Sequence, residues 1–92
     1  SPAMPASRRP ASRATFTFSG QIRPDSFAEF AAHRAARLSV ALDTVALDAT
    51  AARLRVAGAP DLLDAFEMAM SLGPADCLVR EVERNDNDTD ND

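Results

Sequence analysis

Two strand–helix–strand units follow one another in the middle of this 92-residue chain, and their order limits the possible fold more than any other feature. In the first unit, the stretch ATFTFSG at residues 14–20 alternates apolar with polar side chains, which is typical of a half-buried strand. Apolar residues at helical spacing then follow at Phe27, Phe30, Ala31 and Leu38. We therefore expect a strand at 14–20 and a helix over about Asp25–Leu38.

The second unit begins with a hairpin and ends with a strand. Its predicted elements are a weak strand over about Leu42–Leu47, a turn over Asp48–Ala51, a clearer strand around Leu54 and Val56, a helix over Pro60–Leu72, and a last strand in CLVREVE, residues 77–83. The second helix is expected to stop at Leu72 because glycine and then proline follow it.

Local signals also predict how the first helix starts and which residues form the core. Ser26 and Glu29 have the S-x-x-E spacing of a capping box, which indicates a helix start at Asp25 or Ser26. Met68 and Met70 are expected to fill gaps in the core. The main core residues are predicted to be Phe16, Phe18, Phe27, Phe30, Leu54, Val56, Phe66 and Val79.

The element order βαββαβ predicts an α+β fold, the ferredoxin-like sandwich. In it, a four-stranded antiparallel sheet in the order 4-1-3-2 carries both helices on one face, and the other face points Thr15, Thr17, Arg53 and Arg55 into solvent. We place this domain at residues 14–84. Polar and proline-rich composition predicts a disordered N-terminal segment at 1–13 and a disordered acidic tail at 85–92.

Charge and composition exclude several classes of function. The formal net charge is −4, and the four aspartates of the tail account for it, so no basic face remains for a nucleic acid. No apolar run is long enough for a membrane span. One histidine and one cysteine are too few for a metal site, and we expect no cofactor. The lone Cys77 fits a reducing, cytoplasmic location, and the many alanines without any lysine suggest a GC-rich bacterial genome.

The framework resembles the acylphosphatase family over nearly all of residues 14–84. That family carries G-x-V-Q-G-V-x-F-R after its first strand, A-A-x-x-L-G-L in its first helix, an asparagine in its hairpin, and G-P before A-x-V-x-x-V. Aligned without a gap, the matching or similar positions in this chain are Gly20, Ile22, Phe27, Ala35 or Ala36, Leu38, Val40, Gly58, Gly73, Pro74, Cys77, Val79 and Val82.

The residues that carry the family's chemistry do not match. The resemblance implies a loop whose N–H groups and terminal arginine hold an acyl phosphate, and an asparagine that positions the attacking water. Ala28 stands at the arginine position and Ala46 at the asparagine position, and residues 1–84 contain no asparagine at all. Pro24 replaces a glycine and removes a backbone donor, while Asp25 adds a carboxylate.

The resemblance and these departures together predict a catalytically degenerate acylphosphatase-like domain, a pseudoenzyme, with a binding or assembly role. No catalytic residue is expected, and weak ligand binding by the loop would involve Gly20, Gln21, Ile22, Arg23, Ser26 and Phe27. One alternative is an active acylphosphatase with Arg23 as the phosphate clamp, although pairing of Arg23 with Asp25 or Glu29 is the favoured interpretation. Another is a homodimerisation module that pairs through the edge strand LDTVAL. The partner is thus either an unknown protein or a second copy.

Overall fold

A computed structural model describes residues 12–86, which form four strands and two helices. The elements in chain order are β1 (Ser12–Gln21), α2 (Pro24–Leu38), β2 (Ala41–Leu47), β3 (Ala51–Gly58), α3 (Pro60–Leu72) and β4 (Leu78–Asp86). Of the segments predicted to be disordered, 1–13 and 85–92, residues 12–13 and 85–86 belong to strands instead, and the rest lies outside the described residues.

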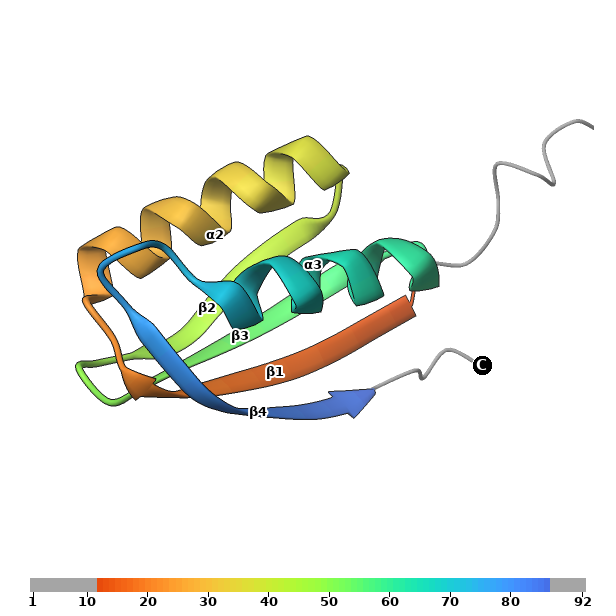
Figure 1. Ribbon diagram of the computed structural model, residues 1–92. Coiled ribbons are helices and arrows are strands. Elements are labelled where there is room, and N and C mark those ends of the chain that lie inside the picture. The colour runs from red at the N-terminus through yellow and green to blue at the C-terminus, as the bar shows by residue number, and fades with distance from the viewer. Residues whose placement is uncertain (1–11, 87–92) are drawn as a thin grey trace, which may run out of the picture.

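The four strands form one antiparallel sheet in the order β2-β3-β1-β4. Both helices lie across the same face of this sheet (Figure 1). This confirms the ferredoxin-like sandwich and the predicted order 4-1-3-2, which is the same order read from the other edge. The end of β1 and the start of β4 lie beside each other. The β1–α2 connection and the α3–β4 connection therefore lie at the same end of the sheet.

The first and last strands extend two residues beyond the predicted 14–84 at each end. β1 begins at Ser12, which pairs with Gly58, and β4 continues to Asp86, which pairs with Ala14. Backbone pairing, and not side-chain burial, holds these positions in the sheet. The apolar alternation used for the prediction therefore does not extend to them.

Aromatic rings from β1 and both helices form the core. Phe18 packs against Phe27 of α2, with ring centroids 5.6 Å apart, and Phe16 packs against Phe66 of α3 at 6.0 Å. The largest fully buried side chains are Phe16, Phe18, Phe27, Phe66, Leu54, Leu63, Met70 and Val56. These include six of the eight residues predicted for the core.

Three apolar residues are less buried than predicted. Phe30 and Val79 are only partly buried and pack against the border of the core. The Arg34 guanidinium lies 5.1 Å above the Phe30 ring, so this ring is covered partly by a charged side chain instead of by the core. Met68, predicted to fill the core, is 68% exposed, because α3 buries Leu63, Phe66 and Met70 and turns Met68 away from the sheet.

The start of α2 differs from the predicted capping box. The helix begins at Pro24, and the N-cap residue is Arg23, which makes no side-chain capping hydrogen bond. Proline suits this first position because its fixed φ is helical and its missing N–H needs no partner there. The Ser26 hydroxyl therefore lies inside the helix and is available for a contact elsewhere.

Candidate functional site

The candidate site is the segment 20–27, here called the loop, which includes the end of β1, the connection and the first turn of α2. Gly20 sets its geometry. Gly20 has φ of 152°, at a point where the pairing of β1 with β4 shifts its register. A Cβ atom at this position would collide with the Leu78 carbonyl oxygen. The glycine is therefore required by the close approach of two strands, whether or not the loop binds a ligand.

Most of the loop's backbone donors are used inside the protein. Gly20 and Ile22 donate their N–H groups to the hairpin turn, to the carbonyls of Thr50 and Ala49 at 3.0 and 2.9 Å. Arg23 donates its N–H to the Cys77 sulfur at 3.3 Å.

The remaining N–H groups are few. Pro24 has none, and Phe27 donates to the Arg23 carbonyl at 2.9 Å. Gln21 is paired with Leu78 of β4, and the N–H groups of Asp25 and Ser26, at the start of α2, have no acceptor within residues 12–86. The cradle of free donors that would surround a phosphate is therefore reduced to two neighbouring groups.

A second carboxylate reaches the loop from the turn between α3 and β4. The Ser26 hydroxyl donates to Asp76 Oδ1 at 2.7 Å, and Arg23 Nε lies 3.8 Å from Asp76 Oδ2. The Ser26 hydrogen bond, with a smaller contribution from the Arg23 charge, lowers the pKa of Asp76 below its ordinary value. Asp76 is thus ionised over the whole physiological pH range.

These residues surround a shallow hollow of about 330 Å³, lined by Arg23, Pro24, Asp25, Ser26 and Asp76. It contains one guanidinium and two carboxylates, and the guanidinium is already beside Asp76. The hollow carries net negative charge and so repels an anion.

The remaining residues predicted for ligand binding do not line this hollow. Ile22 and Phe27 are buried in the core, with 4% and 0% of their surface exposed. Gln21 is exposed at the end of β1, where it pairs with Leu78. Arg23 and Ser26 are therefore the two predicted ligand-binding residues whose side chains line the hollow.

The two positions aligned with the family's catalytic residues lie in different surroundings. Ala28 is partly buried in α2. Ala46 is exposed in β2 and pairs with Arg53 after a bulge between Thr44 and Ala46. Arg53 alternates with buried Ala52 and Leu54, so the register places Ala46 on the sheet face opposite the helices.

Sequence reasoning missed the roles of Asp76 and Cys77 at the loop. It favoured Asp25 or Glu29 as the partner of Arg23, but the structure pairs Arg23 with Asp76. A usable signal was present, because antiparallel pairing of the first and last strands brings the residues just before β4 to the end of β1.

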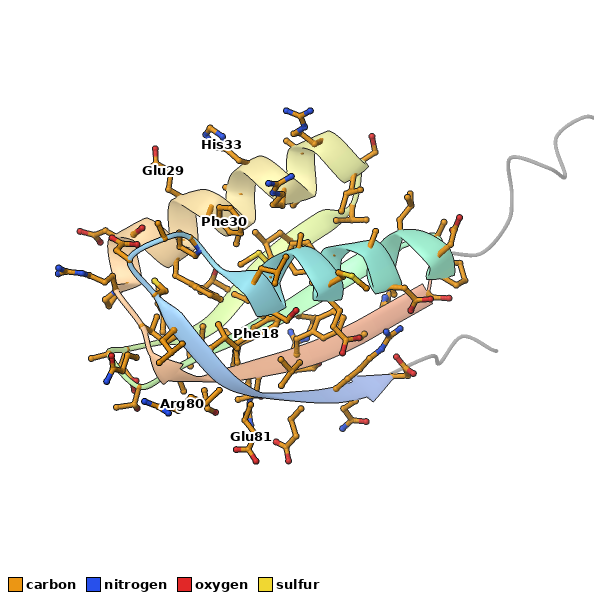
Figure 2. All side chains as sticks on the ribbon, viewed as in Figure 1. Phe18, Glu29, Phe30, His33, Arg80 and Glu81 are labelled. Atoms are coloured by element: carbon orange, nitrogen blue, oxygen red, sulfur yellow. The ribbon has the colours of Figure 1, made fainter. Side chains whose placement is uncertain are left out.

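Other classes of site find no support in the described part of the chain. No group of three or more histidine, cysteine, aspartate or glutamate side chains within residues 12–86 could hold a metal ion. His33 lies on the outer side of α2 with Glu29, pointing away from the sheet (Figure 2). No helix between residues 12 and 86 is long and apolar enough to cross a membrane.

Comparison with known proteins agrees with the architecture. Neither a family model nor a curated protein sequence matches the chain. Among solved structures, an acylphosphatase from Coxiella burnetii superposes with a TM-score of 0.79 at 18% identity, covering 91% of this chain and 88% of that one. An acylphosphatase from Bacillus subtilis superposes with a TM-score of 0.76 at 16% identity, covering 83% and 84%. The chain therefore has the fold of the acylphosphatases.

Proposed function

We propose that this chain keeps the acylphosphatase fold without acyl-phosphate hydrolysis and acts through binding or assembly. The observation that carries the proposal is the hydrogen bonding and charge of the loop. Its N–H groups at Gly20, Ile22 and Arg23 are bonded inside the protein, and its open side faces Asp25 and Asp76. A site that works by electrostatic stabilisation needs free donors aimed at the anion.

The charge balance opposes phosphate binding. Two like unit charges about 5 Å apart near a protein surface repel by roughly 3 kcal/mol before salt screening, whereas one neutral hydrogen bond contributes about 1 kcal/mol. The two free N–H groups of Asp25 and Ser26 therefore do not offset two nearby carboxylates. Arg23 could oppose this repulsion only by leaving Asp76, which would then lose its cation.

Hydrolysis of a simple acyl phosphate such as benzoyl phosphate tests the proposal. The purified chain is expected to match the spontaneous rate in buffer, and Arg23→Ala is expected to change nothing. Turnover by the wild type that disappears in Arg23→Ala would establish the alternative, an active acylphosphatase with Arg23 as clamp.

A rebuilt loop provides the matched positive test. We combine Pro24→Gly, Asp25→Val and Ala28→Arg, and add either Ala46→Asn or Thr44→Asn. Thr44 is included because it pairs with Leu54, whose buried side chain marks the helix side of the sheet, whereas position 46 lies on the opposite side. Turnover in the Thr44→Asn combination alone would show that the bulge shifts the family's asparagine position by two residues.

A further inference from the structure

The sheet face that the helices leave open, here called the free face, carries a regular pattern of charge. It forms a hollow of about 500 Å³ whose lining includes Thr15, Thr17, Val45, Arg53, Arg55, Glu83 and Asn85. Figure 2 shows Glu81, from the same strand as Glu83, pointing away from the helices. Arginines therefore stand on β3 and glutamates on β4, with short threonines of β1 between them.

The strand register places one arginine and one glutamate in a single row. Thr17 of β1 pairs with Arg53 of β3 on one side and with Glu83 of β4 on the other. Neighbouring strands are about 4.8 Å apart, so the two charged residues are about 10 Å apart along the sheet. Within residues 12–86, Arg53 donates a 3.4 Å hydrogen bond to the Thr17 hydroxyl, and Glu83 has no hydrogen bond or ion pair from its side chain.

This row is complementary to itself. A two-fold axis parallel to β1, placed between two free faces, exchanges the β3 and β4 sides while keeping the position along the strands. It stacks Arg53 of each copy on Glu83 of the other, and Thr17 on Thr17. Such an isologous contact makes every pairing twice.

We propose that two copies of this chain pair face to face through the free face, with two reciprocal Arg53–Glu83 ion pairs. Stacked sheets lie about 10 Å apart, a gap that an arginine and a glutamate side chain span end to end. Water bridging the threonine hydroxyls fills the floor of the hollow. This inference gives the assembly role proposed above a partner and a surface, and so rests on that role.

The dimer is weak and sensitive to salt. Exposed ion pairs each contribute little, and salt screens them. We expect self-association at tens to hundreds of micromolar chain, the range of small polar interfaces. Association should fall severalfold on raising the salt concentration to about 1 M, where the Debye length is about 3 Å.

Sedimentation of two charge-reversed variants tests the pairing. Arg53→Glu sets glutamate against glutamate, and Glu83→Arg sets arginine against arginine, so each variant alone is expected to be monomeric. An equimolar mixture is expected to dimerise, because both contacts then join opposite charges. Both variants keep a net negative charge, since each changes the formal charge of −4 by two units, so general attraction cannot imitate the result.

Two control variants distinguish pairing through the free face from a general effect of charge and from pairing through a sheet edge. Arg55→Glu makes the same charge change in the next row, opposite Asn85, and is expected to weaken association less than Arg53→Glu. Thr44→Pro, at a position of β2 on the helix side of the sheet, interrupts edge pairing by β2 and is expected to leave the dimer intact. Circular dichroism confirms that each variant is folded.

The outcomes are distinct from those of the hydrolysis assay, which is run on the same samples. A dimer recovered only in the mixture supports the proposal. It is overturned if the wild type stays monomeric at millimolar concentration, if the mixture stays monomeric while the wild type dimerises, or if Thr44→Pro abolishes the dimer. The last result would assign assembly to the β2 edge.

Discussion

Arg84 and Arg23 lie toward opposite ends of β1, and each stands among carboxylates, but their surroundings differ. Arg84 donates hydrogen bonds of 2.8 Å to Asp64, Glu67 and Asp86, and its guanidinium lies 5.3 Å from the Phe16 ring. Its side chain is 24% exposed. Within residues 12–86, Arg23 has one ion pair, with its Nε 3.8 Å from Asp76 Oδ2, and its side chain is 68% exposed.

The contrast between the two arginines shows at which end of the molecule ion pairs stabilise the fold. At Arg84, partial burial and short bonds fix the geometry, and the hydrogen bond to Asp86 is the main cause of a raised pKa for the arginine. At Arg23 the charges are solvated, and an exposed pair of this kind contributes little. The Arg84 end therefore joins β4 to α3, whereas the Arg23 end mainly sets the charge of the loop.

Removing Arg84 should have the strongest consequence for stability. Arg84→Met takes the common donor from three carboxylates and leaves them close together, so we expect a loss of about 2 kcal/mol in the free energy of unfolding. Urea denaturation measures this. The matched change Arg23→Met should cost less than about 0.5 kcal/mol. Equal losses in the two variants would contradict the comparison.

A more modest change is expected in the acid titration of the loop. Ser26→Ala removes the main cause of the lowered pKa of Asp76, so that pKa should rise toward its ordinary value. Because the folded pKa lies below the unfolded one, the stabilisation by ionised Asp76 is present above the unfolded pKa and is lost as pH falls through the folded pKa.

The titration is followed by the NMR signal of the Asp76 carboxyl carbon. Asp48 is the control, since hydrogen bonds from Thr50 and Ala51, and not from Ser26, lower its pKa. An unchanged Asp76 titration in Ser26→Ala would show that the Ser26 hydrogen bond does not form in solution.

The weakest change should come from the loss of a single loop hydrogen bond. Cys77→Ala removes the sulfur that accepts the Arg23 N–H, so hydrogen exchange at the Arg23 amide should become faster, with a stability change below about 1 kcal/mol. The Ile22 amide, bonded to the Ala49 carbonyl, is the internal control and should keep its protection. Equal exchange of Arg23 in both proteins would mean that the sulfur does not hold the loop.

The fold was predictable because its signals are local. The alternation around Phe16 and Phe18 and the breaks at Gly73 and Pro74 each identify one element, and few topologies accommodate the resulting order. Errors arose where a side chain had competing partners. Ser26 has the spacing of a cap, yet its hydroxyl binds Asp76. Met68 was expected in the core for its residue type, but it lies two residues from buried Phe66 and Met70 and so on the opposite side of α3.

The site was less predictable because its contacts join distant parts of the sequence. Ser26 and Asp76 are 50 residues apart, and no local pattern marks them as neighbours. The bulge between Thr44 and Ala46 also changes which residues of β2 face the helices, and a gap-free alignment cannot show it. The missing backbone N–H at Pro24, in contrast, could be predicted from that residue alone.

The proposed absence of an anion site in the loop can be tested by an NMR titration with inorganic phosphate. The amide signals of Ile22, Arg23, Asp25 and Ser26 are recorded as phosphate rises to tens of millimolar at constant ionic strength. We predict no saturable shift, since two of these N–H groups are bonded internally and two lie beside carboxylates. Saturable shifts confined to these four amides, with half-saturation near about 1 mM or below, would show that the loop still binds an anion and would contradict the proposed loss of function.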